Sequence, residues 1–162
     1  MKKINWLLSA MMLFALSFVA CGDDPKEPGK KPTPTPAPEL TFELDVTETT
    51  ISDVIFNVTP SDLEADYLSV VVEAKVVNSS ESDAAIIKTL YDQIKAAAEA
   101  NGTTFDAYMA ERVKRGALES YKVGGLKSDA KYYLLVFGVD AQNSFATTSK
   151  LYYEQFETKA IQ

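Results

Sequence analysis

The sequence contains no histidine and only one cysteine among its 162 residues. Without histidine, there is no imidazole to act as a general base or to bind a metal ion. A single cysteine excludes an intramolecular disulfide and any zinc site built from several cysteines. Basic residues are also few, 16 against 23 acidic ones, whereas nucleic-acid-binding proteins need a basic surface to displace counterions from phosphates. We therefore do not expect nucleic acid as a partner.

The first twenty residues have the pattern of a secretory signal peptide. Lys2 and Lys3 form a basic start, an apolar stretch follows from Ile4, and the small residue Ala20 ends it. This stretch falls short of the ~20 residues that a membrane-spanning helix needs. We expect residues 1–20 to be removed, which leaves 14 basic and 23 acidic side chains and a net charge of −9.

Cys21, the only cysteine, stands directly after this segment. Phe18-Val19-Ala20-Cys21 resembles a bacterial lipobox, in which the cysteine is lipidated and becomes the mature N-terminus, although Phe18 replaces the usual leucine. The acidic pair Asp23 and Asp24 resembles the export signal of Bacteroidetes-type lipoproteins. The resemblance implies a lipid-anchored protein of the outer membrane that faces the cell exterior, with a periplasmic orientation as the alternative. The other interpretations are an incidental thiol and an acidic tether without sorting meaning.

Residues 21–38 are expected to form a lipidated tether. Six of the seven prolines lie in residues 25–38, where they favour extended polyproline II over a helix or a sheet. At ~3.1 Å per residue, this proline-rich stretch would hold a domain up to roughly 45 Å from the lipid. The folded domain is therefore expected over residues 39–162.

Hydrophobic periodicity in residues 39–162 predicts strands on both sides of a helical segment. Spacings of three and four between apolar residues predict one helix from Ser82 to Asn101 and a short second one from Thr103 to Gly116. Ser82 and Thr103 are the expected N-caps. Alternating or continuous apolar runs predict strands over residues 40–46, 54–58, 67–77, 118–123, 131–140 and about 146–158.

Leu126 and Tyr132 carry a resemblance to a known family. Their spacing of six residues, together with a closing strand that ends at Phe156-Glu157-Thr158, resembles a fibronectin type III domain. In that family the spacing marks the tyrosine corner, whose hydroxyl bonds back to the turn. The resemblance implies a mostly β fold, a fibronectin III/immunoglobulin-like antiparallel sandwich, in which residues 82–116 are a two-helix insertion. Val58 stands where most members have tryptophan. The alternative is an α+β domain with the helices on one antiparallel sheet.

Acidic residues are the main candidates for catalysis or metal binding. Asp62, Glu64, Asp66 and Glu73 have the spacing of a calcium loop, but Tyr67 occupies the position at which that loop needs glycine. Two carboxylates at a suitable separation could still hydrolyse a glycoside. However, almost all acids of residues 39–162 fall at expected strand ends or on polar helix faces, where burial does not raise a carboxyl pKa. We therefore predict no metal site, no cofactor and no enzymatic activity.

The sequence thus predicts a non-catalytic interaction module on the cell surface. It would bind an unknown extracellular protein or glycan, or support a larger surface assembly. The alternatives are a lipoprotein inhibitor of a secreted protease and a small carboxylate-dependent hydrolase. The candidate contacts are Tyr108, Arg112, Lys114 and Arg115, because these cations are dense in an acidic domain and arginine and tyrosine are enriched at interface hot spots. In the other interpretation the two helices only cover a sheet, and the cations favour a helix C-terminus.

Overall fold

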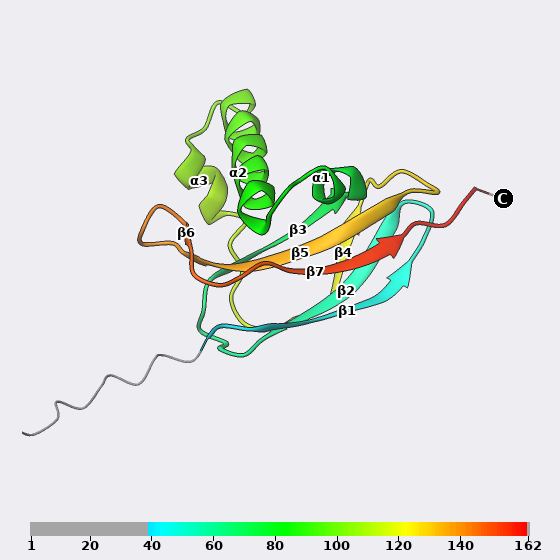
Figure 1. The fold of residues 1–162 in the computed structure, drawn as a ribbon, viewed down its shortest axis with the longest axis horizontal. Helices are drawn as coiled ribbons and strands as arrows, with labels where there is room; N and C mark the ends of the chain where they lie inside the picture. Colours follow the sequence, from blue (N-terminus) through cyan, green and yellow to red (C-terminus); the bar gives the residue numbers. More distant parts are fainter. Residues whose placement is uncertain (1–38, 162) are drawn as a thin grey trace, which may run out of the picture. The chain divides into compact units, whose positions relative to one another are not determined.

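The computed structural model describes residues 39–161 (Figure 1). The predictions for residues 1–38, which include the signal peptide, Cys21 and the proline-rich tether, lie outside the described residues. Along the described chain the elements are β1 (Phe42–Thr49), β2 (Asp53–Pro60), β3 (Tyr67–Glu73), α1 (Ala74–Asn78), α2 (Asp83–Ala100), α3 (Phe105–Ala110), β4 (Leu118–Gly124), β5 (Lys131–Asp140), β6 (Ala146–Thr147) and β7 (Tyr152–Glu157). Within this part, no helix combines the length and the apolar character needed to cross a bilayer.

The strands form two antiparallel sheets. One contains β1, β2 and β4, and the other contains β3, β5 and β7, with β6 paired to the end of β5. The same division separates strands A, B and E from strands C, F and G in an immunoglobulin-like sandwich. The prediction of a mostly β sandwich with a helical insertion is confirmed, and the alternative of a single sheet is wrong. The helices lie between β3 and β4 in the chain, and residues 74–117 are called the insertion below.

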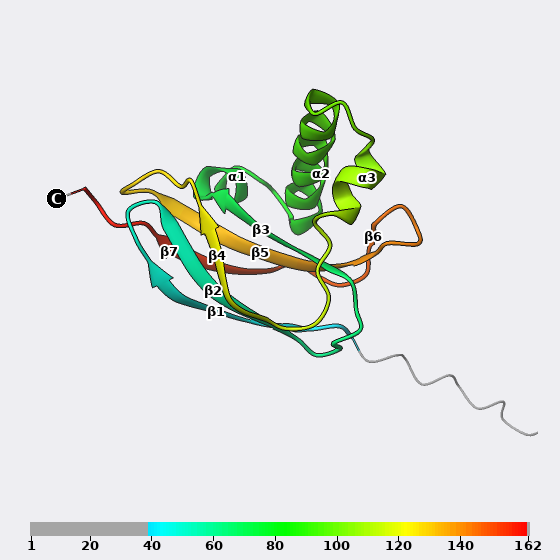
Figure 2. The same cartoon turned by 180° about the vertical axis from the view of Figure 1, so that it is seen from behind.

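The sheet of β3, β5 and β7 is the middle of three layers. The other sheet lies on one side of it, and α2 and α3 stand on the other (Figures 1 and 2). Successive side chains of β5 enter different cores, because neighbours in a strand point to opposite faces. Leu134 and Val136 are buried between the sheets, whereas Leu135 and Phe137 are buried beneath the helices. Burial on both faces explains why β5 is apolar almost without interruption.

The turn before β5 contains the predicted tyrosine corner. The backbone N–H of Lys127 donates a hydrogen bond of 2.8 Å to the hydroxyl of Tyr132. The Tyr132 ring is buried and stacks on Phe156, with 5.7 Å between the ring centroids. Leu126 packs against the same core. The bond that the spacing of Leu126 and Tyr132 predicts is therefore present.

The third strand is shorter than predicted. A strand was expected over residues 67–77, but β3 ends at Glu73 and α1 follows. The reason lies in the partner strand: Glu73 pairs with Tyr132, the second residue of β5, so almost no partner remains for a longer strand. The helical turn instead brings Val76 and Val77 against the core beneath the helices.

Of the two main helices, α2 begins where it was predicted to begin, whereas α3 differs from the prediction at both ends. Ser82 caps α2 as predicted, since its hydroxyl accepts from the N–H of Ala85 at 3.3 Å. The cap of α3 is Thr104 and not Thr103, and the helix ends at Ala110, well before Gly116. The last predicted strand, residues 146–158, is divided into β6 and β7.

Candidate binding groove at the β3 edge

β3 is the outer strand of its sheet, and its free edge begins beside Lys114. The N–H of Tyr67 donates to the Lys114 carbonyl at 3.0 Å, and the Lys114 N–H donates to the Tyr67 carbonyl at 2.8 Å. Because the backbone groups of a strand alternate between its two edges, those of Ser69 and Val71 face the same way as those of Tyr67. Within residues 39–161 the N–H and carbonyl groups of Ser69 and Val71 have no partner on this edge.

A groove of about 550 Å³ follows this edge. It is lined by β3, the second half of α2, the segment from Tyr108 to Lys114, and β4, whose backbone Figure 2 shows. The hydroxyl of Ser69 is buried here and has no hydrogen-bond partner among the described residues. The groove therefore combines apolar surface with unused backbone groups.

Aromatic rings hold two cations at this groove. The Cζ atom of Arg112 lies 3.2 Å from the centroid of the Tyr108 ring, and its Nη1 donates to the Tyr108 carbonyl at 2.7 Å. The same nitrogen is 3.7 Å from the carboxylate of Glu111. The Nζ atom of Lys114 lies 5.2 Å from the centroid of the Tyr121 ring. Three of the four contact residues predicted from the sequence, Tyr108, Arg112 and Lys114, therefore line one groove.

The fourth predicted contact residue, Arg115, does not line the groove. Its Nε and Nη2 atoms donate to one carboxylate oxygen of Asp66, at 3.0 and 2.8 Å. The charge of Arg115 is thus balanced by the loop before β3. For Lys114, by contrast, no carboxylate of residues 39–161 lies within ion-pair distance. The cation cluster expected from the sequence is divided between an ion pair and the groove.

Sequence reasoning missed the backbone edge itself. Neither Ser69 nor the groove-lining Tyr121 and Val123 of β4 was a candidate. A usable signal was nevertheless present, because the helical segment occupies the place where a sandwich of this kind has a further strand. An insertion of helices at that point leaves the edge of the third strand without a neighbour to pair with.

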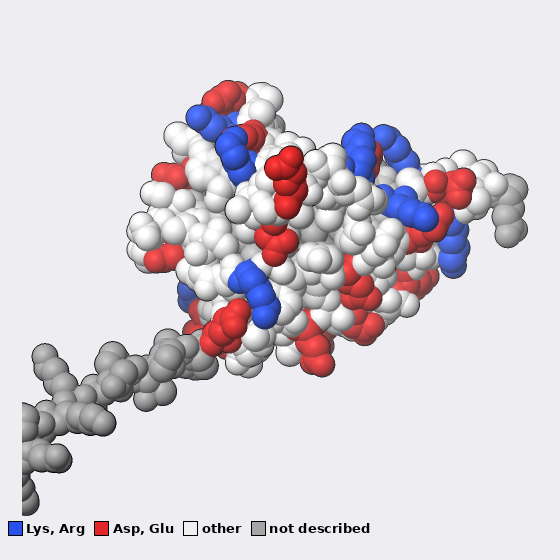
Figure 3. All heavy atoms as spheres, viewed as in Figure 1, with Lys and Arg blue, Asp and Glu red and all other residues white. Residues whose placement is uncertain are grey.

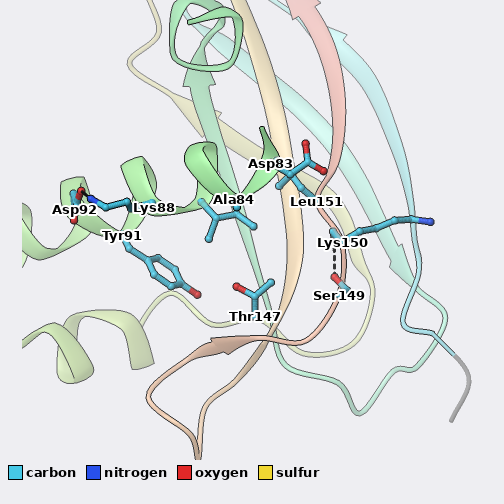
Figure 4. Close-up of a pocket in the computed structure, with 10 residues that line it drawn as sticks. Asp83, Ala84, Lys88, Tyr91, Asp92, Thr147, Ser149, Lys150 and Leu151 are labelled. Carbon is cyan, nitrogen blue, oxygen red and sulfur yellow. Dashed lines mark hydrogen bonds and ion pairs between the residues drawn. The ribbon is translucent and has the colours of Figure 1, made fainter. Parts of the chain in front are cut away.

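A second hollow, of about 650 Å³, lies on the other side of α2, next to β6 and the start of β7 (Figure 4). Several of its polar rim groups already have partners. The Tyr91 hydroxyl donates to the Phe145 carbonyl at 2.6 Å, and burial raises the pKa of Tyr91. Lys88 pairs with Asp92 at 2.6 Å, and the Ser149 hydroxyl donates to the backbone. Among its lining residues only one lies in a strand, the two-residue β6, so this hollow has no strand edge like that of β3.

Cations on the face seen in Figure 3 occur in small groups beside acidic residues. Lys75 and Lys127 both contact the carboxylate of Glu73, and Lys150 lies 3.6 Å from Glu39. The hydrogen bond from Lys127, and then that from Lys75, lowers the pKa of Glu73 to about 2. A general acid at neutral pH needs a shift in the opposite direction.

The four acids with calcium-loop spacing have other partners or lie apart. Asp66 holds Arg115, Glu73 holds the two lysines, and Asp62 accepts a bond of 2.9 Å from the N–H of Glu64. In the part of the chain that the structure describes, no group of three or more acidic, cysteine or histidine side chains could hold a metal ion.

Comparison of the chain with known protein families and with curated proteins gives no match. The groove presents a strand edge, apolar walls and two cations held by aromatic rings. These groups are suited to binding, because apolar surface supplies affinity while charged and hydrogen-bonding groups fix orientation.

Proposed function

We propose that this chain is a non-catalytic binding module that a lipid on Cys21 anchors to the bacterial outer membrane, facing the cell exterior. Its folded part would be a fibronectin III-like domain that holds an extracellular protein or glycan in the β3 groove. One observation carries the proposal: the chain passes from β3 into helices, and β3 keeps an open strand edge next to Arg112 and Lys114.

The signals in residues 1–38 support the anchored part of the proposal. A signal-like segment, a single cysteine at its end, an acidic pair and a proline-rich stretch follow one another in the order that a tethered lipoprotein requires. Several acyl chains on one cysteine anchor a protein firmly, because each buried methylene contributes about 0.8 kcal/mol. The tether would then present the groove to ligands at a distance from the lipid.

The anchor is tested by changing Cys21→Ser in a Bacteroidetes-type host. We expect the variant to leave the membrane fraction or to keep its signal segment, and to incorporate no labelled fatty acid. Gly22→Ser, which keeps the cysteine, is the matched control and should remain in the membrane. Fatty-acid label on the Cys21→Ser variant would contradict the anchor.

The orientation and the binding role need separate measurements. Protease added to intact cells should degrade an outward-facing chain and spare a periplasmic one. Binding is measured with panels of defined peptides and glycans against the purified full chain. Arg112→Ala with Lys114→Ala should weaken binding of any ligand held in the groove, whereas Lys131→Ala with Lys159→Ala removes two exposed cations elsewhere and should not.

A further inference from the structure

The insertion itself starts a β-ladder on the free edge of β3 and then leaves it. Tyr67 and Lys114 exchange the two hydrogen bonds of an antiparallel pair. In a continued ladder, Arg112 would lie opposite Ser69. Instead the Arg112 N–H donates to the Met109 carbonyl at 2.8 Å, because the chain turns here at the end of α3. The edge of β3 is thus a pairing surface whose remaining positions the chain does not fill.

We infer that an extended segment of a partner protein adds to β3 as a strand in this groove, and that this segment carries acidic side chains. The inference rests on the proposed function and specifies its ligand. Ser69 and Val71 each present an outward N–H and carbonyl, so an added antiparallel strand gains about four backbone hydrogen bonds. Main-chain bonds of this kind give a strand-addition complex its affinity.

The walls of the groove suit the side chains of an added strand. Those side chains point alternately to the two sides of the sheet. On one side the groove is lined by Tyr121 and Val123 of β4, and on the other by Ile94 and Ala97 of α2. Apolar residues at alternate positions of an added strand would pack on one of these sides, which leaves the positions between them for the acidic side chains.

The two cations specify an acidic ligand. Arg112 uses one N–H for the Tyr108 carbonyl, and a guanidinium has five N–H donors, so it retains donors for a carboxylate. Lys114 is the groove cation that lacks a carboxylate partner within residues 39–161. Carboxylates are the anionic groups that an extended peptide carries in its side chains, and charge-assisted bonds to them are about twice as strong as neutral ones.

Two other occupants of the β3 edge each meet an obstacle. A second copy that joined its β3 edge to this one would bring Arg112 and Lys114 of both chains close together, and like charges at a strand pair are destabilising. The tether of residues 25–38 carries six prolines, which have no N–H to donate to a ladder. A segment of a different protein meets neither obstacle.

The test uses the full chain and a synthetic peptide with blocked ends, Thr-Glu-Val-Glu-Val-Glu-Val-Thr. We expect saturable binding, together with slower hydrogen exchange at the N–H groups of Ser69 and Val71. A peptide with the same side chains, N-methylated at its central residues, has the same charge but lacks the N–H donors. It should bind at least about tenfold more weakly, since each lost hydrogen bond contributes to affinity.

Protein variants locate the contact. Arg112→Ala with Lys114→Ala should raise the Kd for the parent peptide about tenfold or more, while Lys131→Ala with Lys159→Ala leaves it unchanged. Val71→Pro removes one outward N–H at a sheet edge, where proline is tolerated, and should also weaken binding. Thermal unfolding checks that each variant is folded, and the N-methylated peptide makes the same test without altering the protein.

Each contrary result has its own meaning. Equal affinity for the N-methylated peptide would overturn strand addition but leave a ligand groove in place. No peptide binding, with glycan binding that depends on Arg112 and Lys114, would overturn this inference and support the proposed function. A Kd for the peptide that does not change in the Arg112→Ala, Lys114→Ala variant would overturn the groove as the site. Dimers that Val71→Pro abolishes would make a second copy the occupant.

Discussion

The sandwich and the insertion are built around the same sheet but are closed in different ways. Between the sheets, Phe56 and Val58 lie in a core that two layers of strands cover. Beneath the helices, Leu90 of α2 is buried in one cluster with Leu135 and Phe137 of β5. The Phe105 ring lies edge to face against the rings of Tyr91 and Phe145. The sandwich core is covered by hydrogen-bonded strands, whereas the insertion covers one face and leaves an edge open. Ligand binding is expected where closure is incomplete.

The largest effect is expected from the sandwich core. Phe56 is 1% exposed, and Phe56→Ala should lower the free energy of unfolding by about 4 kcal/mol through lost burial and a cavity. Chemical denaturation measures the loss. The exposed Leu63→Ala is the control for side-chain truncation and should change stability very little. A loss below about 1 kcal/mol for Phe56→Ala would contradict the comparison of a closed core with an open insertion.

A slightly smaller effect is expected from the insertion. Leu90 is buried against the outer face of the sheet, and Leu90→Ala should cost about 3 kcal/mol. Because both cores share β5, we expect one cooperative transition to shift, with helical circular dichroism and tyrosine fluorescence changing together. If the helical signal is lost first while the sandwich remains folded, the insertion is an independent unit.

The tyrosine corner should contribute less than either core. Tyr132→Phe removes the bond from the Lys127 N–H and should destabilise the fold by about 1 kcal/mol. Tyr152→Phe is a matched control, since the buried Tyr152 hydroxyl has no partner among residues 39–161. Its removal should be neutral or slightly stabilising. Equal losses for both variants would show that the corner bond has no special weight.

The smallest effect concerns pH. Lys127 and Lys75 lower the pKa of Glu73 to about 2 from an ordinary 4.5, so this contact stabilises the fold above pH 4.5 and is lost as the pH falls to about 2. Glu73→Gln should therefore be less stable than the parent at pH 6 and equal to it near pH 2. Solvent and salt screen the group, so the difference is small. Glu157→Gln controls for the loss of one carboxylate, and a difference that persists at pH 2 would contradict the assignment.

Local patterns predicted the sandwich well because its signals lie within short stretches of sequence. The spacing of Leu126 and Tyr132 predicts the corner, and Ser82 predicts the start of α2. The errors arise where distant segments meet. The end of β3 depends on where β5 begins. The helix α3 ends at Ala110, before the point where Lys114 pairs with the distant Tyr67.

The candidate site was predicted only in part, for the same reason. Tyr108, Arg112 and Lys114 are close in sequence, and residue type alone marks them, the first by its ring and the other two by their charge. The open backbone of Ser69 has no residue type to mark it, since any residue provides an N–H and a carbonyl. The pairing of Arg115 with Asp66 joins residues 49 positions apart, which no local pattern reveals.

Burial of β5 on both faces has a consequence for how its alignment with β3 and β7 is determined. In a half-exposed strand, a slip by one residue puts the apolar side chains in water, and this cost fixes the alignment. In β5 such a slip would only exchange the side chains of two apolar cores. Shape has to decide instead: a Cβ at Gly138 would lie 2.5 Å from Thr148 Oγ1 and 2.6 Å from Leu40 Cδ2, so both side chains would have to move, and Tyr132 fixes the other end through its bond to Lys127. Gly138→Ala would thus displace the side chains of Leu40 and Thr148 and loosen the control of strand alignment at this end of β5.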